Sequence, residues 1–398
     1  MSKEQNKSFY LAVIVISQFF CTSLWFASNG VMDELISSFN LATTMLGNLT
    51  SAVQFGFIVG TLLVAILRIA DRFHPSYVFA VSAFLGALAN LGLVLEVNSA
   101  FTLLLGRFLT GVFLAGIYPI GMKIAADHFG KGLGKSLGFL VGALVLGTAL
   151  PHLLKEMTQW ISWESVLYIT SGLASLGGLL MWLLVPEGDL RRVGKSMNLG
   201  AFLQVFQDKA FRTAAFGYFG HMWELYAFWA FVPVIIQQYG LRHGLEIHNV
   251  SLLSFTVIGV GMLSCILGGY ISMKKGPEWV ARNALSLSFL SCLCLPFMIF
   301  WAPFVAFYLF LLFWGMVVIA DSPMFSTLVA QTAPTDKKGT ALTIVNCLGF
   351  AISILSIQAL STLNDMFNSI YLYWVLLLGP AIGVALLNIN KRKTRKNL

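Results

Sequence analysis

Apolar runs of roughly 20 residues, each long enough to cross a hydrocarbon core, recur along the whole chain between short polar segments. Backbone polar groups in lipid must be satisfied within the segment itself, so each run is predicted to be a helix. A transmembrane β-barrel would instead need strands of about 10 residues with alternating polarity, and the sequence lacks that pattern. We therefore expect an all-α integral membrane protein.

Twelve transmembrane helices are predicted. The first is not read as a cleaved signal peptide, because it is long and its polar residues Gln18, Thr22, Trp25 and Asn29 share one helical face. The predicted spans are 9–30, 46–68, 76–95, 99–122, 136–155, 163–185, 211–236, 249–273, 283–300, 303–327, 340–362 and 369–389.

A polar, basic segment interrupts this rhythm between the sixth and seventh spans. It predicts an N-terminal six-helix half (1–185), a cytoplasmic linker (186–209) and a C-terminal six-helix half (210–398). The halves also carry a weak repeat. Span four reads GVFLAGIYPIGM from Gly111 and span ten reads GMVVIADSPMFS from Gly315, and each has a proline eight residues later, Pro119 and Pro323. This pattern fits duplication of a six-helix unit.

Composition and charge support the same interpretation. The chain is 58% hydrophobic and only 11% charged, with a mean hydropathy of +0.81, whereas soluble domains carry about 25% charged residues. Of its 25 Lys and Arg residues, all but Arg107, Lys155 and Arg242 fall in the termini and in loops after even-numbered spans. The positive-inside rule then predicts that both termini are cytoplasmic. The net charge of +8 is explained by topology, without a nucleic-acid partner.

Three charged residues lie well inside predicted spans: Arg107, Glu224 and Asp321. A charge at such depth costs about 2.5–3.5 kcal/mol or more, and it usually faces a bundle interior or a water-filled cavity. Glu224 lies in the aromatic stretch YFGHMWELYAFWAF with His221 three residues earlier, on the same helical face. We expect both to line a polar cavity and to exchange protons. The alternative is that both are structural, with Glu224 a partner of Arg107 or of a helix backbone and His221 a hydrogen-bonded packing residue.

Asp321 adjoins Pro323, which removes a backbone donor and opens the helix locally. Its carboxylate is a candidate site for a cation or a proton. Arg107 offers a planar fork of donors that suits an anionic substrate or a carboxylate of the protein, and a buried structural ion pair is its alternative. Further polar residues are candidates for the same cavity, with hydrogen bonding between helices as the alternative. These are Asn29, Trp25, Gln54, Tyr118 and Asn346.

Three local patterns resemble those of a known family. The loop RIADRFHPS retains Asp71 and Arg72 of a G-x-x-x-D-R-x-G-R motif, LLLGRFLTGVFLAG contains Arg107 and Gly111 of an R-x-x-x-G motif, and GFLVGALVLGTALP is rich in glycine. The chain thus resembles a major facilitator superfamily transporter over essentially its whole length. The resemblance implies a gating loop at Asp71 and Arg72, and a link between Arg107 and proton coupling.

The sequence shows no phosphate-binding loop, catalytic triad or metal-ligand cluster, so no cofactor or metal is expected. We predict a monomeric secondary active transporter of a small organic solute in a bacterial inner membrane, coupled to protons and working by alternating access. The alternatives are a receptor that does not transport, or a membrane enzyme that uses Glu224 and His221 as acid and base.

Overall fold

The structure is a computed structural model that describes residues 3–129, 133–158, 160–191, 202–334, 338–367 and 369–396. All regular secondary structure in these ranges is helical, as the apolar runs predict. Clustering of contacts divides the chain into two compact units, Met1–Ser196 and Met197–Leu398. Residues 192–201 of the predicted linker lie outside the described ranges, and the predicted division into two transporting halves remains a prediction.

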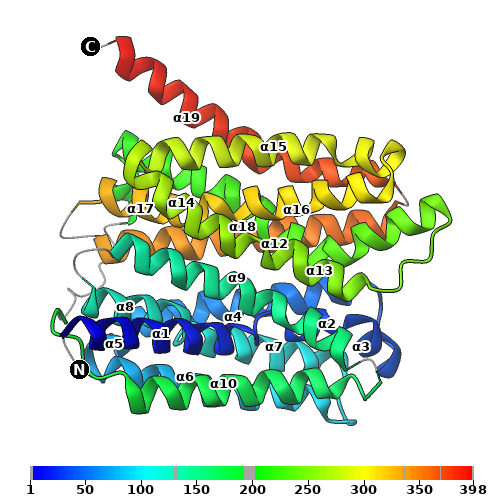
Figure 1. The fold of residues 1–398 in the computed structure, drawn as a ribbon, viewed down its shortest axis with the longest axis horizontal. Helices are drawn as coiled ribbons and strands as arrows, with labels where there is room; N and C mark the ends of the chain where they lie inside the picture. The colour runs from blue at the N-terminus through cyan, green and yellow to red at the C-terminus, as the bar shows by residue number, and fades with distance from the viewer. Residues whose placement is uncertain are drawn as a thin grey trace. The chain divides into compact units, whose positions relative to one another are not determined.

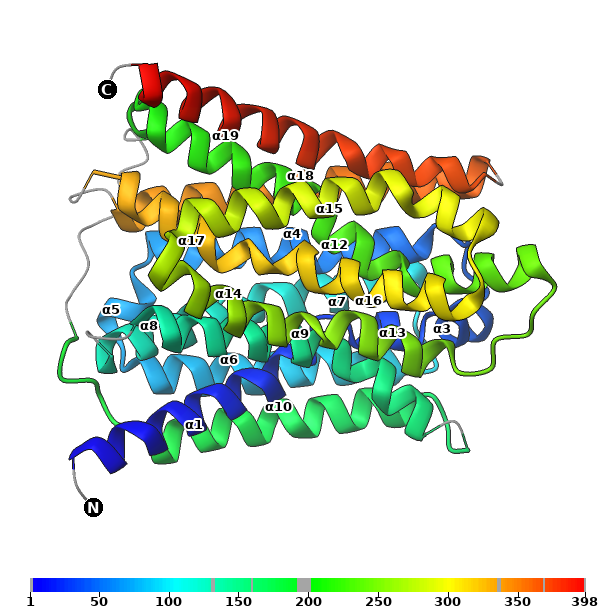
Figure 2. The same ribbon diagram turned by 45° about the horizontal axis from the view of Figure 1, so that its top comes forward.

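The long helices of the first unit run roughly along one direction (Figure 1). Its helices are α1 (Lys3–Thr22), α2 (Ala27–Gly30), α3 (Met32–Ser38), α4 (Met45–Ile66), α5 (Ile69–Arg72), α6 (Pro75–Leu91), η1 (Gly92–Val94), α7 (Ala100–Leu114), α8 (Tyr118–His128), α9 (Leu133–Met157) and α10 (Glu164–Leu184). Helix α10 packs against both α6 and α1, and Figure 2 shows α1 lying beside α10.

In the second unit, α12 forms the centre and packs against α17, α18 and α19. The helices here are α11 (Phe202–Val205), α12 (Lys209–His243), α13 (Val250–Gly259), α14 (Gly261–Lys275), α15 (Pro277–Trp301), α16 (Phe304–Ala320), α17 (Ser322–Thr332), α18 (Lys338–Met366), η3 (Ile370–Leu377) and α19 (Leu378–Lys396). Helix α12 contains Glu224 and is the most enclosed of the long apolar helices.

Eleven helical segments of the described chain are long and apolar enough to cross a membrane, and they correspond to predicted spans two to twelve. The first predicted span, 9–30, is shorter as a continuous helix, because α1 ends at Thr22 and α2 begins at Ala27. Residues 23–26 between them form turns with hydrogen bonds from Leu24 N to Cys21 O and from Trp25 N to Thr22 O. The prediction of a single regular helix over 9–30 is therefore wrong in detail.

Spans four and ten are interrupted at matching places. Helix α8 begins after Ile117 and α17 begins after Asp321, and each has a proline in its first turn. Proline fits the first turn of a helix but cannot donate to the turn before it. The interruptions therefore follow from Pro119 and Pro323, and they recur at the spacing at which the two sequence segments align.

Each unit contains a close contact between two helices, and the two contacts are of the same kind. A Cβ added to Gly111 on α7 would lie 2.1 Å from the carbonyl oxygen of Val53 on α4. A Cβ on Gly315 of α16 would lie 1.9 Å from the carbonyl oxygen of Val257 on α13. Small residues allow helix backbones to approach this closely in membranes. Val257 lies as many residues after Val53 as Gly315 lies after Gly111. The sequence repeat therefore has a structural counterpart.

Candidate functional site

Glu224 is buried in the second unit with three side-chain donors on one of its oxygens. Its Oε1 accepts hydrogen bonds from Ser288 Oγ at 2.5 Å, Trp314 Nε1 at 2.6 Å and Cys292 Sγ at 3.2 Å. Ser288 and Cys292 are one turn apart on α15, and Trp314 lies on α16. Donors of this kind stabilise an ionised carboxylate, whereas removal from water favours the neutral acid. The two opposing effects suit a group that gains and loses a proton.

An aromatic contact holds the indole of Trp314 in place. The Phe228 ring, one turn after Glu224 on α12, lies 4.1 Å from the Trp314 ring, centroid to centroid. Phe228 and Trp314 are both fully buried. Aromatic pairs in contact typically contribute about 0.5–1.5 kcal/mol beyond burial alone. The aromatic character of span seven therefore serves, at this position, to fix a hydrogen-bond donor for Glu224.

His221 and Asp321 form a second buried polar contact in the same unit. His221 Nδ1 lies 2.8 Å from Asp321 Oδ1, and each side chain is 1% exposed. Asp321 is the residue at which span ten is interrupted, so the contact joins α12 to that interruption. Spacing along the sequence alone grouped His221 with Glu224. The link between His221 and Asp321 could not be seen that way, because the two residues belong to different spans.

Arg107 is fully buried on α7 of the first unit and binds backbone carbonyls. Its Nη1 donates to Leu24 O at 3.0 Å, and its Nη2 donates to Trp25 O. These carbonyls belong to the turns between α1 and α2. The guanidinium thus satisfies acceptors that the interruption of span one leaves without helical partners. Neither expected use of Arg107, an anionic substrate or a protein carboxylate, is tested by this arrangement.

The remaining predicted cavity residues are divided between the units. In the first unit, Asn29 Nδ2 donates to Thr50 Oγ1 at 2.8 Å, and the Trp25 ring lies 4.9 Å from the Phe57 ring. Gln54 is fully buried on α4, and Tyr118 is half-buried at the start of α8.

In the second unit, Asn346 on α18 accepts a hydrogen bond from Tyr218 of α12 at 2.9 Å. This bond between two helices matches the packing alternative for Asn346.

The predicted gating loop forms a charged cluster at one end of the first unit. Asp71 lies 3.7 Å from the Lys123 ammonium on α8, while Arg72 is exposed. Arg191 donates to the carbonyls of Asp71 and Phe73 at 3.1 Å and 2.9 Å. It also donates to Glu187, and this hydrogen bond holds the pKa of Glu187 below its usual value. The loop is thus tied to α8 and to the segment that follows α10.

One buried histidine was not singled out from the sequence. His152 on α9 is 2% exposed, and its Nε2 has no hydrogen-bond partner among the described residues. A histidine inside the apolar run 136–155 was the signal that could have identified it. No group of three or more His, Cys, Asp or Glu side chains in the described ranges is placed to hold a metal ion.

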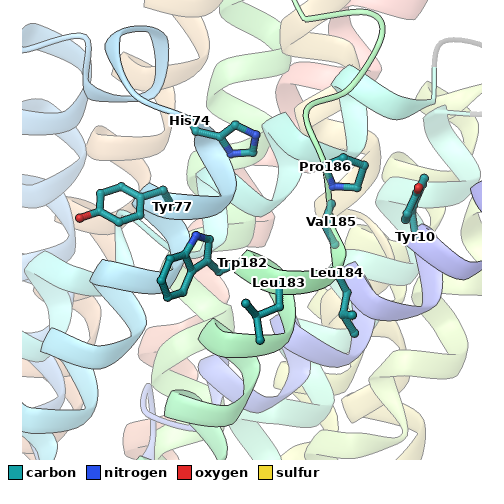
Figure 3. Close-up of a pocket in the computed structure, with 8 residues that line it drawn as sticks. All are labelled: Tyr10, His74, Tyr77, Trp182, Leu183, Leu184, Val185 and Pro186. Atoms are coloured by element: carbon teal, nitrogen blue, oxygen red, sulfur yellow. The ribbon is translucent and has the colours of Figure 1, made fainter.

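A hollow of about 620 Å³ opens at the surface of the first unit, and its lining residues His74 and Pro186 are next in sequence to Phe73 and Glu187 of the gating-loop cluster. Figure 3 shows its lining, in which His74 and Trp182 lie on one side and Val185 and Pro186 on the other. It is lined by Tyr10, His74, Tyr77, Trp182, Leu183, Leu184, Val185 and Pro186. None of the predicted site residues lines it.

Comparison with known proteins agrees with this architecture. The model of the Major Facilitator Superfamily matches residues 14–357. Among solved structures, one similar chain is the proton:xylose symporter XylE bound to 6-bromo-6-deoxy-D-glucose, with a TM-score of 0.75 and 14% sequence identity. The match covers 98% of this chain and 96% of that chain. No curated protein matches the sequence.

Proposed function

Because the chain belongs to the major facilitator superfamily, it is a multi-pass membrane protein and a secondary transporter, and we propose that it is coupled to protons through Glu224. In this proposal a small organic solute crosses the membrane by alternating access, as the two units move relative to one another. The division into two compact units supports this mechanism. The proposal places the protein in a bacterial inner membrane with both termini cytoplasmic, as a monomer.

The observation that carries the proposal is the environment of Glu224. Glu224 is enclosed in a membrane span and accepts hydrogen bonds from Ser288, Cys292 and Trp314. The hydrogen bonds favour its ionised form, whereas removal from water favours its neutral form. A change in helix packing that moves any one donor shifts that balance. Protonation is then linked to conformation, and linkage of this kind is reciprocal.

Two further pairs of residues enter the proposal with smaller roles. In this proposal the protonation of His221 and Asp321 also changes during the cycle, because their contact joins α12 to the interruption in span ten and responds to movement there. Asp71 and Arg72 form the predicted gating loop, and the contact of Asp71 with Lys123 supports a role in holding one state.

The test uses proteoliposomes with an imposed pH gradient and a panel of labelled sugars, polyols, amino acids, organic acids and amines. We expect at least one solute to accumulate only when the gradient is present. Glu224→Gln is expected to abolish that accumulation while leaving exchange of the same solute across the membrane. Glu278→Gln is the matched control, since this side chain is 55% exposed and faces Arg282. Gradient-driven accumulation that persists in Glu224→Gln contradicts the proposal.

A further inference from the structure

The interruption of span one places neutral polar side chains next to α4. Asn29 donates to Thr50, and the Trp25 ring contacts the Phe57 ring. Gln54 is one turn after Thr50 and three residues before Phe57 on α4. It therefore lies on the face of α4 that meets the interruption.

The amide of Gln54 is buried without a partner. The side chain is fully buried, and neither Nε2 nor Oε1 has a hydrogen-bond partner among the described residues. The Oδ1 of Asn29 is in the same condition, and so are both amide atoms of Gln18, which precedes the interruption on the polar face of α1. Buried polar groups are nearly always paired, because an unmade hydrogen bond in a water-free environment is costly. Binding of a polar group of the solute during the transport cycle would explain why these amides lack partners within the protein.

Asn90 in the same unit is an example of a buried amide with a structural role. It is also fully buried, but its Nδ2 lies within hydrogen-bond distance of Leu167 O, Thr170 Oγ1 and Ser171 Oγ, at 3.3, 3.2 and 2.9 Å. Only its Oδ1 has no partner among the described residues. Asn90 therefore joins α6 to α10, whereas Gln54 joins nothing that the described chain provides.

Charge around the interruption limits what these amides can bind. Both terminal nitrogens of Arg107 are engaged by carbonyls of the turns that follow α1, and only its Nε has no hydrogen-bond partner among the described residues. The carbonyl end of a helix carries partial negative charge, which balances a cation placed there. An amide offers both donors and acceptors but no net charge. The complementary ligand is a neutral group that itself donates and accepts, namely a hydroxyl or a carboxamide.

We propose that Gln54 and Asn29, continued by Gln18 along α1, bind a neutral hydrogen-bonding group of the transported solute. The inference rests on the proposed transport function and specifies the class of solute. The first unit thus supplies neutral recognition, while the ionisable groups Glu224 and Asp321 belong to the second unit.

The first arm of the test needs no ligand. Purified wild-type protein, Gln54→Leu and Asn90→Leu are melted in detergent, with Gln54→Met as a second variant in case leucine packs poorly. We expect both Gln54 variants to melt at or above the wild-type temperature, because they remove an unpaired buried amide. Asn90→Leu is expected to melt lower by roughly 2–4 °C or more. A comparable loss in both Gln54 variants would show a structural amide and overturn the proposal.

The second arm measures protection of the same proteins against melting by six probes. Glycerol and ribitol test hydroxyl groups, acetamide and propionamide test carboxamides, and sodium acetate and methylammonium chloride test charged groups. A ligand that binds only folded protein raises its melting temperature. We expect protection of the wild type by one neutral pair and an apparent affinity at least about tenfold weaker in Gln54→Leu. The pair that protects identifies the solute as hydroxyl-bearing or carboxamide-bearing.

The contrary outcomes are distinct. Protection by acetate or methylammonium alone, no protection by any neutral probe, or equal protection of wild type and Gln54→Leu each overturns the proposal. Failure of the proposed function gives a different result, in which neutral probes protect the wild type through Gln54 but no solute accumulates in proteoliposomes under a pH gradient.

Discussion

Spans one and seven are the first predicted membrane spans of the two units, and the charged groups at them are bound by different kinds of partner. Span one is interrupted, and the cation Arg107 binds the carbonyls that the interruption exposes. Span seven is the continuous helix α12, and its Glu224 is bound by side chains of α15 and α16. A permanent cation on backbone acceptors is a fixed feature, whereas a carboxyl group among side-chain donors can change state. At these two positions the same repeat holds a constant charge in the first unit and a titratable one in the second, and we refer to them as the constant unit and the titratable unit.

The largest expected effect tests the constant unit. Arg107→Leu removes the donors to Leu24 O and Trp25 O, and unsatisfied buried acceptors cost about 1–3 kcal/mol each. We expect the free energy of unfolding to fall by about 2–5 kcal/mol, measured by denaturation in detergent with helicity as the signal. Arg107→Lys keeps the charge but loses the fork, so its loss should be intermediate.

The control for Arg107 is Arg282→Leu, whose partner Glu278 is largely exposed. Loss of this pair, in which Arg282 is 14% and Glu278 is 55% exposed, is expected to change stability by at most about 1 kcal/mol. If Arg107→Leu is as stable as Arg282→Leu, the carbonyls of span one do not depend on the guanidinium, and the contrast with span seven fails.

An effect of intermediate size tests what the two units share. Alanine at Gly111 or at Gly315 would place its Cβ 2.1 or 1.9 Å from a backbone oxygen of the neighbouring helix. We expect each substitution to cost about 1–3 kcal/mol, because two backbones must separate. An equal fall in the free energy of unfolding for the two substitutions would show that the two units use the same helix contact for stability. Gly172→Ala on α10 is the control, since nothing lies within 4 Å and alanine favours a helix by up to about 1 kcal/mol.

The smallest expected effect tests the titratable unit. A double-mutant cycle of His221→Asn and Asp321→Asn should give a coupling energy of about 0.5–3 kcal/mol, because the two side chains are in contact. A second cycle of His221→Asn with Glu224→Gln should give a smaller value, since the partners of Glu224 are Ser288, Cys292 and Trp314. A larger coupling energy between His221 and Glu224 than between His221 and Asp321 would instead support the pairing of His221 with Glu224 that their spacing suggested.

Much of the fold was predictable, because it depends on the length and polarity of continuous segments. Eleven of the predicted spans correspond to long apolar helices, and Pro119 and Pro323 marked the interruptions of spans four and ten. The interruption after Thr22 was missed, since no proline or glycine occurs at residues 23–26. The carbonyls that it exposes are bound by Arg107, a residue more than 80 positions away in the sequence.

The candidate site was predictable only as a set of residues. Embedded charge is costly, so Arg107, Glu224 and Asp321 could be selected from their positions in apolar runs. Their partners could not, because Ser288, Trp314 and the carbonyls of residues 24 and 25 lie on other helices. Spacing within one helix brings residues to the same face, but it does not determine which neighbouring helix that face meets.

The contact at Gly111 has a mechanical consequence for span four. Two backbones that touch without an intervening side chain have no rotamers to adjust, so the α4–α7 seam is among the stiffest contacts available to a pair of helices. Bending of span four is therefore expected beyond this contact, at residues 115–117 between the end of α7 and the start of α8. We therefore expect α8 to move as a rigid body about residues 115–117, while α7 stays fixed against α4 because Gly111 has no side chain.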